Sequence, residues 1–378
     1  MGYVAVKGGT LAIEESIKRL KYERLKKGDV LDVHGIECGM RCLIDQVMSE
    51  SSLYSETLAA ISIKQAEGSP EEAVFLMRAY RSTLPRKHYS RTVHPDDMLA
   101  ERRISASFKD IPGGQILGAT CDYTHRLIDF ELNNETEGDI SNWLHNFARD
   151  NGINSCATDL ANLPKILDYL RREGLLQDCE NNDREPDDIT RESVKFPTSR
   201  SERLQILTRG QTGAVTSLGY AALRGYGALH PTVGELRVGH LPLYVDNPFD
   251  GEDEDDAYYI GGIKVTEVET LFPAPVQKEN GVKEIEFGIG YGICYGQNET
   301  KAIAMSILDH CLETGSPEYP THNEEFVLLH IDSVEATGFI SHLKLPHYVT
   351  FQSKLDSVRK SKKSGRGKDM ESDGELNP

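Results

Sequence analysis

The residues whose types and spacing could most directly support chemistry are two histidines near the C-terminus, His342 and His347. They are five positions apart, whereas a helix needs a spacing of four to point both rings the same way. Pro346 disfavours helical backbone at the residue before it, so we expect a loop that turns both imidazoles toward one metal ion. Imidazole suits zinc, and two ligands leave positions open for substrate oxygens or a partner's ligand. Two ordinary histidines near the end of a strand are the alternative.

A zinc site that works without a partner needs at least one more ligand from the same chain. His330 or Asp332 could supply that ligand in a stand-alone zinc hydrolase. The sequence has no HExxH zinc motif, no GxSxG nucleophile motif and no clear nucleophile–base pair. The two histidines therefore remain the main candidates for chemistry.

Basic residues near glycines or a helix start form a second group, with phosphate as the expected ligand. Lys7 precedes a glycine pair, and Lys109 comes shortly before a Pro-Gly-Gly turn. Arg200 and Arg203 fall at the expected start of a helix. Backbone amides at such turns, a helix dipole and an arginine fork all suit phosphate. An ordinary structural turn is the alternative at each position.

Three alternating glycines, Gly288, Gly290 and Gly292, put positions without side chains on one face of a predicted strand. This spacing is not GxGxxG, so it does not favour a dinucleotide-binding site. It predicts close approach of another backbone, a helix or a ligand. Tight packing and ligand approach both remain open.

The elements expected to position these groups change from helix to strand along the chain. The first 90 or so residues read as helical, with Ser69 and Pro70 starting one helix. Residues 140–225 again read as helical, and Ser199 or Ser201 should open a helix there.

Strand composition begins at about residue 234. Asn298 should then cap a helix, and residues 324–332 (EEFVLLHID) are expected to form a buried strand. The fold class is α+β, with a helical N-terminal part, a mixed α/β C-terminal domain and a disordered C-terminal tail. The predicted regions are a mainly helical 1–135, a helical 136–232, a mixed α/β 233–357 that carries the His pair, and a disordered tail at 358–378.

Composition limits the class of protein. The formal charge of -18 disfavours nonspecific binding to nucleic acid, and no apolar run approaches the roughly 20 residues of a membrane helix. The seven cysteines include no CxxC pair, and we expect reduced thiols in a cytoplasmic protein. The acidic segment 246–256 is expected to be mobile, and neither it nor the tail is given a function.

Segments spread in order over nearly the whole chain resemble the I subunit of the carbon–phosphorus lyase core complex. Together they are more specific than any single motif. They are YVAVKGG (3–9), EAVFLMRAYRSTLPR (72–86), ERRISASFKDIPGGQILGATCDYTHRLIDF (101–130), EPDDITR (185–191), SRSERLQ (199–205), RGYGALHP (224–231), YGICYGQNETKAIAM (291–305) and EEFVLLHIDSVEATGFISHLKLPHYVTFQ (324–352).

The resemblance implies a complex with G, H and J subunits, to which K and L subunits attach. With G, H and L, such a subunit supports replacement of the purine of ATP or GTP by methylphosphonate, which gives alpha-D-ribose 1-methylphosphonate 5-triphosphate. Alone it would be a nucleosidase. The family's HxxxxH pair maps onto His342 and His347, where zinc would bind near the interface with the J subunit, which cleaves the C–P bond.

The implied reaction is a substitution at an anomeric carbon, with a transition state of oxocarbenium character. Triphosphate recognition is expected from arginine forks, lysines and glycine turns, and the residues predicted for it are Lys7, Arg103, Lys109, Arg200 and Arg203. No catalytic acid or base can be assigned. The alternative is a scaffold that completes the zinc site without performing the glycosyl transfer.

Overall fold

The computed structural model describes residues 9–151, 163–176, 185–225, 230–247, 256–277, 281–315 and 318–372, with side chains as far as residue 363. The chain divides into two units, which are described separately. One comprises Met1–Leu31 and Glu335–Pro378, and the other comprises Asp32–Val334.

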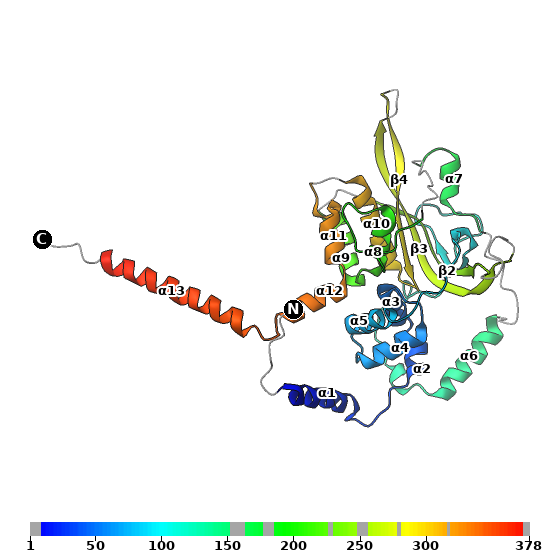
Figure 1. The fold of residues 1–378 in the computed structure, drawn as a ribbon. Helices are drawn as coiled ribbons and strands as arrows, with labels where there is room; N and C mark the ends of the chain where they lie inside the picture. The colour runs from blue at the N-terminus through cyan, green and yellow to red at the C-terminus, as the bar shows by residue number, and fades with distance from the viewer. Residues whose placement is uncertain are drawn as a thin grey trace. The chain divides into compact units, whose positions relative to one another are not determined.

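Helices predominate, and the strands join one sheet, so the predicted α+β class is confirmed (Figure 1). Short 3₁₀ turns lie at Pro95–Asp97, Glu131–Asn134 and Pro320–His322. The strands are β1 (Leu99–Ile104), β2 (Thr232–Val245), β3 (Tyr258–Gln277) and β4 (Lys283–Tyr295). The helices are α1 (Gly9–Leu25), α2 (Val33–Gly39), α3 (Arg41–Ser51), α4 (Glu56–Gln65), α5 (Pro70–Arg81), α6 (Glu137–Asn151), α7 (Leu167–Arg172), α8 (Arg200–Arg209), α9 (Thr212–Arg224), α10 (Glu299–Thr314), α11 (Glu324–His330), α12 (Ser333–His342) and α13 (Tyr348–Ser372).

Helices α2 to α5 pack around a core of their own. Its buried members include Val47, Met48, Val74 and Met77, each at most 1% exposed. The predicted start of α5 is confirmed, because the Ser69 side chain accepts a hydrogen bond from a backbone amide of the first turn and proline occupies that turn.

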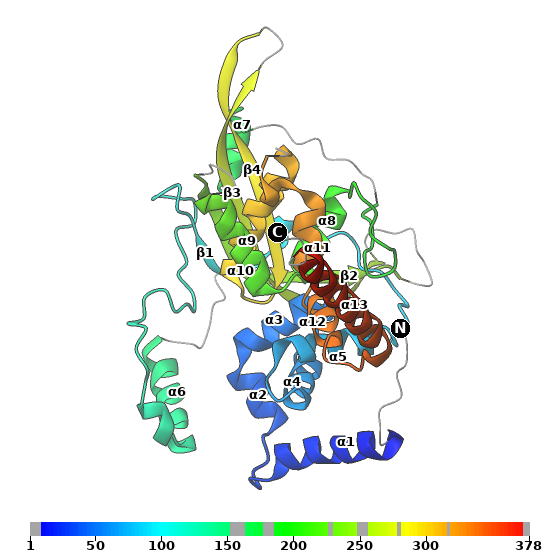
Figure 2. The same ribbon diagram turned by 90° about the vertical axis from the view of Figure 1, so that its left-hand side faces the viewer.

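Among the described residues, four strands form an antiparallel sheet in the order β1-β2-β3-β4. Strand β1 comes from the N-terminal region that was predicted to be mainly helical, and it pairs with β2 more than a hundred residues later. In Figures 1 and 2 the β3–β4 ribbon extends beyond the rest of the sheet. Because the sheet includes strands so far apart in sequence, its two faces bring distant side chains together.

Helix α10 covers one face of the sheet at β3 and β4. A Cβ atom added at Gly290 would collide with the backbone carbonyl of Ser306, and one added at Gly292 would collide with that of Ala302. The alternating glycines therefore permit backbone-to-backbone packing of α10 on β4, as the tight-packing interpretation predicted. The predicted cap is also confirmed, because the Asn298 side chain accepts a hydrogen bond from the Lys301 amide at 3.2 Å.

The prediction of a strand at 324–332 was wrong. Residues Glu324–His330 form helix α11, which Asn323 caps by accepting a hydrogen bond from the Phe326 amide at 2.8 Å. Val327 and Leu328 are buried against neighbouring helices. A short apolar run fits a buried strand and a buried helix equally well, and here the cap and the two first-turn glutamates favour the helix.

The C-terminal region begins with helix α13, which is described as far as Ser372. Its described side chains are exposed apart from Leu355, which is half-buried. Residues 373–378 of the predicted tail lie outside the described residues.

No helix among the described residues combines the length and the apolar character that crossing a membrane requires. The described cysteines, Cys38, Cys42, Cys121, Cys294 and Cys311, are free thiols, as expected. The predicted mobile segment 246–256 lies largely outside the described residues.

We predict that Gly292→Val destabilises the chain by about 2 kcal/mol or more, because the new side chain must push α10 away from β4. Chemical denaturation should show this loss. Gly213→Ala is a matched control, since a Cβ there meets nothing within 4 Å and alanine favours helix. Equal stability of the two variants would contradict the packing described above.

Candidate functional site

The His pair lies where α12 ends and α13 begins. His342 is the last residue of α12, a turn follows, and His347 immediately precedes α13. The two Nε2 atoms are 3.3 Å apart. The ring centroids are 4.8 Å apart, and the ring planes are nearly perpendicular, at 82°. The loop geometry predicted from Pro346 is confirmed, and it turns both Nε2 atoms toward each other.

A second contact of His347 defines what its Nε2 atom can do. Its Nδ1 atom lies 2.5 Å from the backbone carbonyl oxygen of Leu345, which can only accept a hydrogen bond. Nδ1 therefore carries the proton, and in the neutral ring Nε2 keeps its lone pair. A carbonyl that fixes the tautomer in this way is a common second partner of metal-binding histidines.

The spacing of the two Nε2 atoms fits zinc. Two nitrogens bound at 2.0–2.1 Å in a tetrahedral site lie about 3.3–3.4 Å apart. A hydrogen bond from a protonated Nε2 of His342 to His347 would give a similar distance. The residues present thus suit a tetrahedral metal and also suit a simple ring-to-ring hydrogen bond.

The described residues contain no group of three or more metal-ligating side chains. The two residues expected to complete a stand-alone site have other contacts: Asp332 pairs with Arg78 at 2.6 Å, and His330 contacts the carbonyl of Phe326 at 2.6 Å. The prediction of a third ligand is therefore not met in the described part of the chain. The large apolar residues around the His pair are highly exposed: Phe339, Ile340, Leu343, Leu345, Tyr348, Val349 and Phe351.

A second candidate region lies on the face of the sheet opposite the glycines, where acidic side chains of β2 and β3 are buried. Glu267 is bonded to Arg237 on β2 and to Lys165, whose Nζ lies 2.8 Å away. The Tyr291 hydroxyl donates to the same carboxylate at 3.0 Å. One glutamate thus gathers three partners from two strands and from the segment before α7.

The other two glutamates of this face are held in a similar way. Glu269 accepts from Arg171 at 2.8 Å and lies 3.5 Å from Lys165. Glu235 accepts from Arg103 at 2.8 Å and from the Ile166 amide at 2.9 Å. Because buried charges are costly unless they are paired, these contacts fix segment 163–172 over the sheet.

The pKa values follow from these contacts. Burial raises the pKa of Glu267, but the positive charges of Arg237 and Lys165 outweigh burial, so its pKa lies below the ordinary 4.5. Burial, reinforced by the negative charge of Glu267, raises the pKa of Tyr291 well above its usual value. At neutral pH the glutamate is therefore ionised and the tyrosine is protonated.

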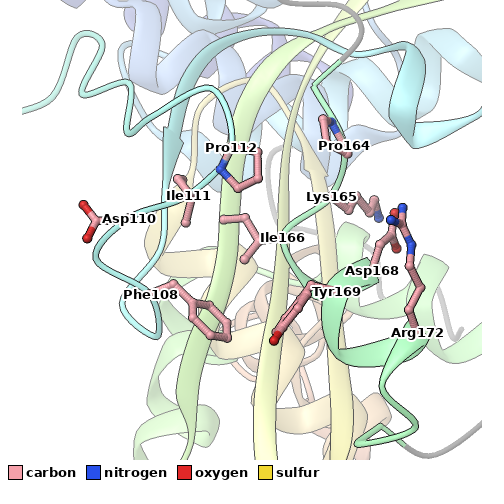
Figure 3. A pocket seen from close by; sticks show the side chains of 10 residues that line it. All are labelled: Phe108, Asp110, Ile111, Pro112, Pro164, Lys165, Ile166, Asp168, Tyr169 and Arg172. Atoms are coloured by element: carbon pink, nitrogen blue, oxygen red, sulfur yellow. The ribbon is translucent and has the colours of Figure 1, made fainter.

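Segment 163–172 also forms one wall of a cavity of about 350 Å³ (Figure 3). The other wall is the loop around the Pro-Gly-Gly turn. Arg103 connects the two walls, since its guanidinium donates to the carbonyls of Pro112 at 2.6 Å and Pro164 at 2.7 Å. The lining residues are Phe108, Asp110, Ile111, Pro112, Pro164, Lys165, Ile166, Asp168, Tyr169 and Arg172.

The residues predicted to bind phosphate are dispersed. Lys7 lies outside the described residues. Arg103 is fully buried and bonded to protein acceptors, while Lys109 is exposed beside the cavity residue Asp110. Arg200 and Arg203 extend from α8 to Asp309 and Glu313 on α10. Phosphate binding by these residues stays a prediction.

Sequence reasoning missed the sheet face on which Glu235, Glu267 and Glu269 are buried, which we call the charged face. A usable signal existed in the alternation of Glu267 and Glu269 along a strand, which places both side chains on one face. Their partners could not be identified, because Lys165 and Arg171 lie about a hundred residues away in sequence.

Comparison with known proteins gives a consistent result. A family model described as a bacterial phosphonate metabolism protein, PhnI, matches residues 2–365. A putative C-P lyase subunit protein, HtxH, of Stutzerimonas stutzeri is 43% identical, with 95% of each chain covered. An alpha-D-ribose 1-methylphosphonate 5-triphosphate synthase subunit PhnI of Escherichia coli K12 is 40% identical over 95% of this chain and 98% of its own. The subunit of the same name from Rhizobium meliloti is 39% identical, with 96% and 95% covered.

We predict that Glu267→Gln lowers the free energy of unfolding by about 3 kcal/mol at neutral pH, because it leaves two buried cations without their shared anion. A carboxylate with a lowered pKa stabilises the fold above its unfolded-state pKa and loses this contribution as pH falls. The difference from the wild type should therefore shrink as the pH drops below 4.5. Urea unfolding at several pH values measures it.

Glu101→Gln is the control. Glu101 also pairs with a lysine, Lys264, at 2.6 Å, but its side chain is 47% exposed. Exposed pairs contribute only about 0–1 kcal/mol. If both variants lost the same stability at neutral pH, the charged face would not have the role described.

Proposed function

The chain belongs to the PhnI family of bacterial phosphonate metabolism proteins, and on this basis we propose that it is a subunit of a carbon–phosphorus lyase complex. With partner subunits it replaces the purine of ATP or GTP by methylphosphonate. The product is alpha-D-ribose 1-methylphosphonate 5-triphosphate. In the absence of phosphonate and partners, water takes the place of phosphonate and the chain acts as a nucleosidase.

The observation that carries this proposal is the extent of the similarity. The relatives named as subunits of this synthase match the chain over 95% or more of its length, with no large part left out on either side. The assignment therefore does not depend on a single motif.

The proposed reaction exchanges two bonds at the anomeric carbon of the ribose. The bond to the purine breaks, its electron pair leaves with the base, and the base takes up a proton. A phosphonate oxygen supplies the electron pair of the new bond. Because positive charge develops on the sugar between these events, a site with nearby anionic groups suits the transition state.

We assign His342 and His347 as ligands of a zinc ion. Their Nε2 separation of 3.3 Å and the contact that fixes the His347 tautomer support this assignment. When bound, zinc would supply a Lewis acid for phosphonate or phosphate oxygens. A ligand from the J subunit would complete the coordination, and the exposed apolar residues around the pair suit that interface.

The proposed partners are the G, H and J subunits of the core complex, with the K and L subunits associating. The proposed location is the cytoplasm, on the basis of the family.

A scaffold role is the second candidate for the function. It is favoured because the guanidinium groups of Arg103, Arg200 and Arg203 already contact protein acceptors. In that case the chain would hold zinc for its partner without performing the transfer.

The two roles predict different results for one experiment. The purified chain, incubated with ATP or GTP, should release free purine, which chromatography detects. His342→Ala with His347→Ala should abolish stoichiometric zinc in the assembled complex, whereas His125→Ala, at an exposed histidine, should leave zinc unchanged. If neither the chain nor its complex with the G, H and L subunits released base, the transferase role would be wrong and the scaffold role would stand.

A further inference from the structure

We propose that the cavity between the Pro-Gly-Gly loop and segment 163–172 holds the purine base of the nucleoside triphosphate. This inference rests on the proposed function and adds a location for the substrate. The cavity belongs to the unit Asp32–Val334, whereas the His pair belongs to the other unit. It contains none of the predicted phosphate-binding residues, although Lys109 is next to it in sequence.

The walls of the cavity suit a flat aromatic ring. Phe108 and Tyr169 contribute rings from its two sides, and Ile111, Pro112 and Ile166 add apolar surface (Figure 3). Stacking on aromatic side chains is a common way in which proteins hold nucleobases. The ring of Tyr169 is available for it, because this residue is 57% exposed although it lines the cavity.

The size of the cavity favours the base over the whole nucleotide. A volume of about 350 Å³ lies near the lower end of the 300–1,000 Å³ that is typical of small-molecule sites. It therefore suits part of a nucleoside triphosphate, with the rest of the molecule outside.

Charge decides which part enters. Asp168 lines the cavity and pairs with Arg171 at 2.7 Å, and Asp110 stands at its edge with its carboxylate directed away (Figure 3). Because a carboxylate has several acceptor sites, the paired Asp168 can still accept a hydrogen bond from the amino group of a purine, and neither carboxylate favours a triphosphate. The cation Lys165 is already paired with Glu267. The base is therefore the part that this lining accepts.

A cation at the rim is suited to the triphosphate. Arg172 lines the cavity, and its guanidinium has no hydrogen bond or ion pair within the described part of the chain. Its neighbour Arg171, in contrast, is paired with Asp168 and Glu269. An unpaired arginine fork beside a base site matches phosphate oxygens in geometry and charge.

The rigidity of the cavity follows from the charged face below it. Arg103 bonds to both walls, and Glu235 holds both Arg103 and the Ile166 amide. Lys165 is fixed by Glu267. The two walls are thus preorganised by buried contacts, so that little ordering is needed when a ligand binds.

The test uses a fluorescent aminopurine riboside triphosphate, whose emission falls when the base stacks on an aromatic ring. Titrated with the purified chain, the wild type should quench this probe. Tyr169→Leu should weaken binding about tenfold, as expected for the loss of one stacking partner. Tyr169→Phe keeps the ring and should bind like the wild type. Because Tyr169 is exposed, these variants should fold normally.

Tyr80→Leu is the matched control, since Tyr80 is 47% exposed on α5 and does not line the cavity. If Tyr169→Leu quenched the probe as strongly as the wild type does, the proposal would be overturned. Loss of subunit assembly with unchanged nucleotide binding would also overturn it, and would identify the cavity as a docking site for a partner side chain.

Failure of this inference can be separated from failure of the proposed function. Purine release by the wild type, with an unaltered KM for ATP in Tyr169→Leu, would contradict only the location of the base. Absence of purine release from every assembly would instead contradict the function. An increase of about tenfold in KM for ATP in Tyr169→Leu, with Tyr80→Leu unaffected, is the result that we expect.

Discussion

A sheet that buries carboxylates on one face must cover them with cations, and this requirement organises residues 32–334. Glu235, Glu267 and Glu269 point to the same face, and none of them is more than 5% exposed. Their partners come from two strands and from segment 163–172. On the opposite face, glycines of β4 let α10 approach the backbone. The first face is thus distinguished by its ion pairs, which lie beside the apolar cluster of Leu167, Leu170 and Leu271.

Contacts on both of its walls keep the cavity in place. Segment 163–172 is held over the sheet by ion pairs at Lys165 and Arg171 and by the packing of Leu167 and Leu170 in an apolar cluster. Arg103 holds the facing Pro-Gly-Gly loop and also bonds to the segment. The His pair needs none of this framework, since the end of one helix, a turn and a proline are sufficient to bring its rings together. The two candidate sites are thus built by different means in separate units of the chain.

What could be predicted from the sequence was local. The helix starts at Ser69 and Asn298 were correct because a cap depends on only a few neighbouring residues, and of the two serines predicted for α8 the structure has Ser199 as the cap. The geometry of the His loop was predictable for the same reason. The strand assigned to 324–332 failed because a short apolar run does not distinguish strand from helix.

What could not be predicted was non-local. Pairing of β1 with β2, and of Lys165 with Glu267, joins residues more than a hundred positions apart. No spacing in a single sequence reveals such pairs. Arg103 illustrates the consequence: it was predicted to bind the triphosphate, whereas the structure shows its guanidinium bonded to Glu235 and to both walls of the cavity.

The most direct test of the link between the charged sheet face and the substrate is photolabelling of the assembled complex with an azido derivative of ATP, followed by peptide mapping. We expect label on the peptides that contain Phe108 or Tyr169, and we expect excess ATP to prevent it. Labelling confined to other segments or to other subunits, with equal protection by ATP, would contradict the claim that this cavity receives the base.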